Sequence, residues 1–274
     1  MIPLQIRFSS ALGFAAVLAA TTPLAAQDSA AAGTPPRIST AAHRFAVRGT
    51  VVALATIATM PFDLTLADAM RGRSVQGSAP LRSTARAFDA AGDPGVLIAS
   101  ALMYGVGRAA RAPRLQRIGL HAGEAVVVAG ATTTLLKAVA GRQRPFIEAG
   151  DADDYTPFRV SGGHTSFPSG HTTVAFAFAS AVTAELAAGN SRAAWVAGPL
   201  LYGGATLVGM ARMYDDKHWA SDVVLGAGIG TLAGVESVAF SRAHPHNRVE
   251  RMLGSVTIAP TAHGAAVAMR FATR

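Results

Sequence analysis

Residues 166–173 read S-F-P-S-G-H-T-T and lead directly into a long run of Ala, Val and Phe. Proline and serine ahead of an apolar run are typical of the start of a helix. The free backbone N–H groups at such a start bind anions, and Gly170 lets a ligand approach the backbone closely. His171 would then stand beside a bound anion as an acid. Taken alone, the same stretch fits a helix capped by Ser169 in which His171 has no chemical role.

A second cluster, K-A-V-A-G-R-Q-R-P, ends a long predicted helix at residues 137–145. Lys137 and Arg144 are seven residues apart, which predicts that they share a helical face. Two cations on one face can clamp the oxygens of a phosphoryl group, although favourable charge at a helix C-terminus explains them as well. Only two of the 24 basic residues are Lys, at positions 137 and 217, which sets Lys137 apart.

A third cluster, R-M-Y-D-D-K-H-W-A-S-D, covers residues 212–222. His218 and Asp222 are four residues apart, which predicts one face of a helix. An aspartate in that position accepts a hydrogen bond from one ring nitrogen and leaves the other nitrogen nucleophilic. A His–Asp pair on a helix surface without any function fits this spacing equally well.

Taken in order, Lys-x6-Arg-Pro, Pro-Ser-Gly-His and Arg-x5-His-x3-Asp resemble the signature of the type 2 phosphatidic acid phosphatase (PAP2) superfamily. This superfamily includes class A acid phosphatases, lipid phosphatases and vanadium haloperoxidases. The resemblance covers about residues 94–240, and the ordered set of three motifs is far more specific than any one of them. The third motif often begins Ser-Arg in the family, whereas it begins Ala211-Arg212 here.

The resemblance implies a role for each matching residue. His218 would attack phosphorus and form a phosphohistidine, Asp222 would orient its ring, and His171 would protonate the leaving oxygen. The implied phosphate-binding residues are Lys137, Arg144, Arg212, Ser169 and Gly170. No metal ion or other cofactor is expected, and vanadate is expected to inhibit as a phosphate mimic.

The implied function is therefore a phosphatase that hydrolyses phosphomonoesters, either a lipid phosphate or a soluble phosphate ester. The alternatives are a lipid phosphotransferase or diphosphate phosphatase in the membrane, and a vanadate-dependent haloperoxidase. A purely structural helical bundle is a further reading, which the intact motifs argue against. The net charge of +8 suits anionic partners such as phosphate esters and a membrane surface. Nucleic acid is not expected as a partner, because the basic residues are scattered and not interleaved with aromatic ones.

The apolar pattern predicts an all-α fold, a PAP2-like helical bundle with a C-terminal β-hairpin. Alternating apolar residues over Val256–Ala259 and Ala265–Phe271 indicate that hairpin. Segment 61–92 is mixed, with a short helix expected near 81–90. The six main helices are expected at Phe45–Met60, Gly95–Ala110, Leu115–Ala140, Gly170–Leu186, Ala193–Arg212 and His218–Phe240.

Residues 1–26 have the features of an export signal: Arg7, a short apolar core and small residues before position 27. The expected organisation is a signal peptide (1–26), a flexible linker (27–40), the phosphatase domain (41–250) and a tail (251–274). The expected location is the periplasm or cell envelope. Most uncharged stretches are only 12 to 14 residues long, which favours a domain outside the bilayer, with integration into the membrane as the alternative.

Overall fold

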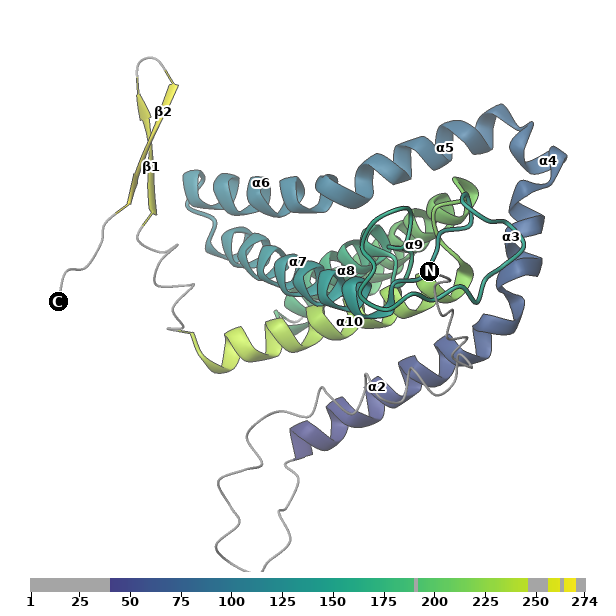
Figure 1. Cartoon of the computed structure of the whole chain (residues 1–274). Helices are drawn as coiled ribbons and strands as arrows, with labels where there is room; N and C mark the ends of the chain where they lie inside the picture. Colours follow the sequence, from purple (N-terminus) through teal and green to yellow (C-terminus); the bar gives the residue numbers. More distant parts are fainter. Residues whose placement is uncertain (1–39, 190–191, 246–255, 262–263, 270–274) are drawn as a thin grey trace, which may run out of the picture.

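The computed structural model describes residues 40–189, 192–245, 256–261 and 264–269, and over these residues the chain is a helical bundle with a small hairpin (Figure 1). The predicted all-α fold is confirmed, and each of the six expected helices is present with ends shifted by five residues at most. The expected signal and nearly all of the linker lie outside the described residues. The elements are α2 (Thr40–Thr59), η2 (Met60–Phe62), α3 (Asp63–Arg71), α4 (Arg73–Gln76), α5 (Ala79–Ala90), η3 (Ala91–Gly95), α6 (Val96–Ala109), α7 (Pro113–Ala140), α8 (Gly170–Ala188), α9 (Arg192–Tyr214), α10 (Ala220–Ala243), β1 (Val256–Thr261) and β2 (Gly264–Met269).

The predicted hairpin is formed by β1 and β2, which pair antiparallel from Val256 opposite Met269 to Thr261 opposite Gly264. Segment 61–92 is more helical than expected, because α3 and α4 precede the anticipated short helix α5. These helices leave the main bundle and then return to it through η3 (Figure 1).

The bundle has two ends, which we call the motif end and the distal end. Helices α7 and α9 finish at the motif end, where α8 and α10 begin; α6 finishes and α7 begins at the distal end. Helix α2 runs from the distal end to the motif end, because Arg48 pairs with Glu236 near the end of α10 at 2.8 Å. Asp63, just after α2, contacts Ser221 at the beginning of α10. All three motifs therefore meet at one end of the bundle.

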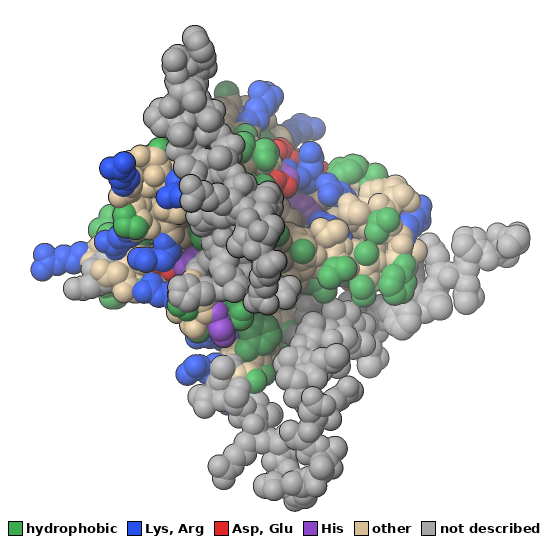
Figure 2. Space-filling model, turned by 90° about the vertical axis from the view of Figure 1, so that its left-hand side faces the viewer, with side chains coloured by type: hydrophobic (Ala, Val, Ile, Leu, Met, Phe, Trp, Pro, Cys, Tyr) green, Lys and Arg blue, Asp and Glu red, His purple; other side chains and the backbone are tan. Residues whose placement is uncertain are grey.

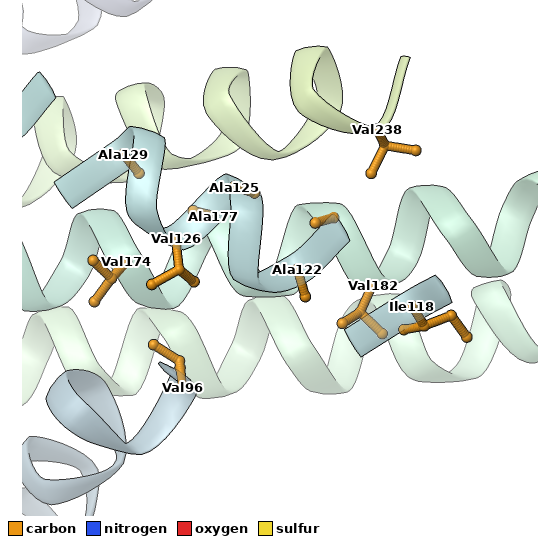
Figure 3. Packing of buried hydrophobic residues seen from close by; sticks show 11 residues of the cluster. Val96, Ile118, Ala122, Ala125, Val126, Ala129, Val174, Ala177, Val182 and Val238 are labelled. Atoms are coloured by element: carbon orange, nitrogen blue, oxygen red, sulfur yellow. The ribbon is translucent and has the colours of Figure 1, made fainter. Parts of the chain in front are cut away.

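Small side chains form the core where α6, α7, α8 and α10 meet. Ala122, Ala125 and Ala129 of α7 are completely buried, and Ala177 of α8 lies against them (Figure 3). Such small residues bury little apolar area each, but they let the helix backbones approach closely, so that packing contacts hold the bundle.

Helix α10 carries a stripe of glycines, Gly226, Gly230 and Gly234, four residues apart. A Cβ at Gly230 would lie 2.2 Å from the Thr173 carbonyl oxygen, and one at Gly234 would lie 1.8 Å from Ser180 Oγ. Only glycine permits this approach, and the same spacing is common where helices pack in membranes. The stripe therefore brings α10 against α8, the helix that begins with Gly170 and His171.

Four long helical segments are long and apolar enough to cross a membrane: 42–71, 113–140, 192–214 and 220–243. Only 22% to 28% of their most apolar windows is buried inside the structure, so most of this apolar surface faces outward. Trp195 is 85% exposed and Leu200 is 72% exposed, for example. These segments indicate association with a membrane, and they favour the membrane alternative over a domain outside the bilayer. The lengths of the uncharged stretches underestimate these apolar segments, because charged residues such as Asp63 interrupt the stretches in sequence but are buried in the fold.

Candidate active site

The motif residues gather around the first turn of α8. A Cβ at Gly170 would lie 3.8 Å from Lys137 Cε, which places the α7 cation against the start of α8. The charges of Lys137 and Arg144 act on His218, and those of Lys137 and Arg212 act on His171. Two histidines and three cations from the three motifs thus face one small region.

His218 is oriented toward Asp222, but the helical-face explanation of this pair is wrong. Helix α10 begins at Ala220 with Trp219 as its N-cap, so His218 lies in the preceding turn. The His218 Nδ1 atom is 3.5 Å from Asp222 Oδ2, which is long for a hydrogen bond. Catalytic hydrogen bonds are often long without a ligand and shorten in the substrate complex. The ring presents Nδ1 to the carboxylate, which leaves Nε2 as the nitrogen available to a substrate.

Several hydrogen bonds fix the Asp222 carboxylate in place, so that it can orient the His218 ring. Its Oδ2 atom accepts hydrogen bonds from the Trp219 N–H at 2.8 Å and from Ser166 Oγ at 2.5 Å. Its Oδ1 atom accepts one from Arg142 Nη1 at 2.7 Å. Asp222 also caps α10, and its carbonyl accepts the Ser169 N–H at 3.0 Å. One residue thereby joins the beginnings of α8 and α10.

Arg142 and Asp63 are structural partners that the sequence analysis missed. The Arg142 side chain is 1% exposed and Asp63 is 0% exposed, and their Nη2 and Oδ2 atoms lie 2.7 Å apart. Arg142 also donates to Ser221 Oγ at 2.8 Å. Asp63 and Asp222 therefore share one buried guanidinium, which offsets the cost of burying their charges. In the sequence, Arg142 is one arginine among many, and no spacing distinguishes it.

Lys137 and Arg144 are also positioned differently from the prediction. Helix α7 ends at Ala140, and Gly141 adopts a left-handed conformation with φ of 56°. Arg144 therefore lies in the following loop and does not share a helical face with Lys137. Lys137 Nζ donates to the Thr165 carbonyl at 2.5 Å. The turn at Gly141, and not helical periodicity, brings Arg144 toward the site.

The Ser169 side chain is less free to rotate than its predicted role as a hydrogen-bond donor to phosphate requires. Its side chain is fully buried, and its hydroxyl shares a hydrogen bond of 2.9 Å with Thr172 Oγ1. It is the N-cap residue of α8, but its side chain makes no capping hydrogen bond. The backbone N–H groups of Gly170 and His171 belong to the first turn, which has no intrahelical partners for them. The backbone at this turn is therefore the stronger anion-binding feature.

Burial and the neighbouring cations favour neutral histidines in the site. Burial is the main reason why the pKa of His218 falls to about 3, and the Lys137 and Arg144 charges lower it further against the opposing effect of Asp222. Burial and then the Arg212 charge lower the pKa of His171, while Asp89 and Asp93 act in the other direction. A neutral His218 is the form that can attack an electrophile.

Two buried donor atoms at the site point to a missing acceptor. The Nε atoms of Arg144 and Arg212 are buried and have no hydrogen-bond partner within the described part of the chain. Burial and the Arg212 charge lower the pKa of Arg144, which reflects cations held close together. An anion between these side chains would satisfy both donors. In the same described ranges, no group of three His, Asp or Glu side chains is arranged to hold a metal ion.

Asp89 is another residue at the site that the sequence analysis missed. It lies at the end of α5, and its Oδ1 atom accepts a hydrogen bond from Arg212 Nη1. The same oxygen is 3.9 Å from His171 Nε2. As one of three aspartates in segment 61–92, Asp89 gives no sequence signal, because its importance comes only from the return of α5 to the bundle.

A family model covers the part of the chain that carries the three motifs. This model is described as PAP2 superfamily and matches residues 118–245. A lipid A 1-phosphatase of Rhizobium johnstonii is 30% identical over 202 residues, which cover 68% of this chain and 79% of that protein. One from Porphyromonas gingivalis is 45% identical over 71 residues, or 25% of this chain, and the match spans only 15% of that relative's length. One from Rhizobium etli is 36% identical over 115 residues, which cover 41% and 46% of the two chains.

Among solved structures, the chain is similar to a transmembrane PAP2 type phosphatidylglycerolphosphate phosphatase from Bacillus subtilis. The two are 22% identical, and the match covers 70% of this chain and 98% of the other, with a TM-score of 0.35. At that TM-score the two backbones superpose only loosely.

Proposed function

The chain belongs to the PAP2 superfamily, and from that premise we propose that it is a lipid phosphatase that acts through a phosphohistidine on His218 and needs no metal ion. The observation that carries the proposal is the meeting of His171 and His218 with three cations at the beginning of α8. The three relatives described above are lipid A 1-phosphatases, so a phosphorylated glycolipid of the lipid A type is the first substrate to test.

In the first step, the Nε2 atom of His218 attacks phosphorus and the bond to the leaving oxygen breaks. The fixed Asp222 carboxylate faces Nδ1 and stabilises the positive charge that develops on the ring. His171 must be protonated for this step, a form that Asp89 and Asp93 favour, and it gives its proton to the leaving oxygen, which departs as an alcohol. Lys137, Arg144, Arg212 and the first turn of α8 bind the non-bridging oxygens.

In the second step, water attacks the phosphohistidine from the side that the alcohol has left. His171, now neutral, accepts a proton from this water, and the N–P bond to His218 breaks. Inorganic phosphate is released and both histidines return to their starting forms. An alcohol in place of water would make the same intermediate a phosphotransferase, so the balance depends on which acceptor reaches the site.

Metal independence is part of the proposal because three cations and a helix N-terminus supply the positive charge that a metal ion would otherwise provide. Vanadate should bind as a mimic of the five-coordinate phosphorus, since such mimics bind more tightly than substrates.

The apolar helices extend the proposal to the place of action. With segments 42–71, 113–140, 192–214 and 220–243 in the bilayer, the motif end would lie near one membrane surface. A lipid phosphate group also lies at that level, so a lipid could keep its acyl chains in the membrane while its phosphate enters the site.

The test is a phosphate-release panel with the full-length protein in detergent. The substrates are lipid A 1-phosphate, phosphatidic acid, a lipid diphosphate, a nucleotide and an aryl phosphate, each with EDTA and without added metal. We expect release from a lipid phosphate that EDTA does not abolish, inhibition by vanadate, and an acid-labile phosphoenzyme. Strict dependence on a divalent ion, or a phosphoenzyme that persists without His218, would overturn the mechanism. Halide oxidation with vanadate and peroxide, without phosphate release, would favour the haloperoxidase alternative.

A further inference from the structure

One wall of the candidate site comes from a segment outside the three motifs and outside the family match at residues 118–245. This wall, residues 89–93, consists of the last two residues of α5 and the first three of η3. Its Asp89 carboxylate contacts two site residues at once. The Oδ1 atom accepts a hydrogen bond from Arg212 Nη1 and lies 3.9 Å from His171 Nε2.

Gly92 allows the wall to press directly on the His171 ring. A Cβ at Gly92 would lie 3.1 Å from His171 Cδ2 and 3.0 Å from Val208 Cγ1 of α9. These distances are tighter than nine in ten real Cβ contacts, so a larger residue at position 92 would require Val208 or the His171 ring to shift by a few tenths of an ångström. The wall therefore packs against Cδ2, the ring carbon that is bonded to Nε2.

We propose that Asp89 is a positioning residue for the reaction: its carboxylate holds Arg212 against the phosphoryl group and keeps a proton on His171 for the leaving oxygen. The inference rests on the proposed function, because it assigns a partner to the general acid of that reaction. A carboxylate that contacts an arginine and a histidine together can perform both tasks, since it accepts from each donor.

The charges around His171 show why such a partner is needed. Arg212 from α9 and Lys137 from α7 face the ring and disfavour its protonated form, as does burial. Asp89 from α5 and Asp93 from η3 are the groups that favour it. A phosphate site needs cations, but the same cations weaken the acid that must protonate the leaving group. Asp89 supplies an opposing charge next to the His171 ring.

A competing role for Asp89 predicts different behaviour. Its carboxylate could simply occupy the anion site next to Arg212 until a phosphate displaces it. Removing the charge would then tighten vanadate binding and leave the acid function of His171 unchanged. The two roles therefore differ in the pH profile and in the leaving-group dependence of the same variant.

The experiment compares Asp89→Asn and Asp89→Ala with the wild type, using the full-length protein in detergent. Asn removes the charge but keeps an oxygen that accepts from Arg212, whereas Ala removes both. Asp68→Asn is the matched control, because Asp68 pairs with Arg71 on the surface of α3 and its side chain is 76% exposed. For each protein, kcat and KM are measured from pH 4 to pH 9 on an alkyl phosphate and on a nitrophenyl phosphate, together with vanadate inhibition.

For Asp89→Asn we expect the alkaline limb of the alkyl phosphate profile to move to lower pH, because His171 then loses its proton more easily. At neutral pH the alkyl phosphate kcat should fall about tenfold, part of the 10²–10⁴-fold that a general acid contributes. The nitrophenyl phosphate should be nearly unaffected, because nitrophenolate leaves without a proton. Asp89→Ala should lower activity on both substrates as Arg212 loses its orientation, and Asp89→Glu should recover part of the alkyl activity.

Superimposed pH profiles of Asp89→Asn and wild type, or equal losses on the two substrates, would overturn the inference. So would tighter vanadate binding with an unchanged profile, which is the result expected of a placeholder anion. These outcomes differ from a failure of the proposed function, in which the wild type itself releases no phosphate from any substrate. Thermal unfolding of each variant shows whether a loss of activity reflects a loss of structure.

Discussion

The Asp222 carboxylate accepts hydrogen bonds from three donors other than His218, and these bonds limit how the His218–Asp222 pair can move. With Ser166, Trp219 and Arg142 bound to the carboxylate, it cannot rotate to follow the imidazole. In the proposed mechanism, any shortening of the 3.5 Å separation would therefore come from the imidazole ring and not from the carboxylate. Such rigidity is useful in catalysis, because a carboxylate already fixed in place does not have to reorganise as charge develops.

The two histidines have separable roles in the proposed mechanism, and the leaving group distinguishes them. His218→Ala removes the nucleophile and should abolish both activity and the phosphoenzyme for every substrate. His171→Ala removes the leaving-group acid, so we expect a loss of about 10²–10⁴-fold on an alkyl or lipid phosphate and a far smaller loss on a nitrophenyl phosphate. Rates on both substrates, with acid-labile labelling of each variant, provide the measurement. Equal losses across leaving groups for His171→Ala would show that the roles are assigned wrongly.

The buried His218 should also make stability depend on pH. Its pKa is about 3 in the folded protein, below the ordinary value of 6.5, so the unfolded chain binds a proton that the folded chain rejects. The stability that the folded state gains from the neutral His218 is fully present above pH 6.5. The free energy of unfolding therefore decreases as the pH falls from 6.5 toward 3. We expect a loss of about 1.4 kcal/mol per pH unit in the middle of that range.

The measurement is chemical unfolding in detergent at several pH values, for the wild type and His218→Asn. Asn cannot be protonated, so the variant should lose less stability than the wild type between pH 6.5 and pH 4. Groups that do not interact with His218 titrate alike in both proteins and cancel in the difference. Parallel curves for the two proteins would mean that His218 is as easily protonated in the fold as in the unfolded chain.

At this scale, the sequence was informative about the identity of residues and poor on how they are placed. Ordered motifs identified His171, His218 and Asp222, which the fold brings to one end of the bundle. The expected helical faces were wrong, since α7 ends before Arg144 and α10 begins after His218. Asp89 and Arg142 could not be found, because their partners are more than 75 residues away and only the tertiary fold brings them together.

At the scale of elements, the contact between α8 and α10 decides the geometry of the site. Helix α8 provides His171 and the anion-binding turn, and the beginning of α10 provides Asp222. The glycine stripe of α10 fixes how closely the two helices approach. Helix length and apolar periodicity predicted these elements well, but neither property reveals which helices pack together. Glycines four residues apart are visible in the sequence, but the helix that they contact is not.

Gly230→Ala tests this contact. The added Cβ would lie 2.2 Å from the Thr173 carbonyl oxygen, which forces the two helix backbones apart. Overpacking of this kind costs about 1–3 kcal/mol of stability, and the displaced site should lose activity as well. Gly203→Ala on α9 is the matched control, because nothing lies within 4 Å of its added Cβ.

The control variant should keep full activity and gain about 0.5–1 kcal/mol from the better helix propensity of alanine. Thermal unfolding and phosphate release on the same preparations provide both readouts. If Gly230→Ala were as stable and active as Gly203→Ala, the close packing of α8 and α10 would not be needed for the site.

At the scale of the whole molecule, the distal end has a distinctive charge. Arg108, Arg111, Arg114 and Arg117 surround the short turn between α6 and α7, with no acidic residue among them. Figure 2 looks onto this end and shows Lys and Arg side chains spread over it. In membrane proteins, short loops rich in Arg and Lys remain in the cytoplasm. By this rule we expect the distal end to lie inside the cell and the motif end outside.

The direction of α2 connects this orientation to the start of the chain. Helix α2 runs from the distal end to the motif end, so a motif end outside the cell requires α2 to begin in the cytoplasm. An export signal at residues 1–26 would instead place the start of α2 outside. If α2 spans the bilayer, the expected signal and an external active site are therefore incompatible. The only arrangement that keeps both is a domain lying wholly outside the membrane.

Cysteine labelling distinguishes these arrangements directly, because the chain contains no cysteine of its own. Ala110→Cys marks the turn at the distal end, and Asp153→Cys marks the exposed loop at the motif end. In intact cells with a permeabilised outer membrane, a membrane-impermeant maleimide should label Asp153→Cys. It should reach Ala110→Cys only after the cells are broken, because four arginines keep that turn on the cytoplasmic side.

The reverse labelling pattern would place the site in the cytoplasm with an exported N-terminus. Labelling of both positions in intact cells would indicate a domain that lies outside the bilayer. Either result would show that the arginines around the α6–α7 turn do not set the orientation.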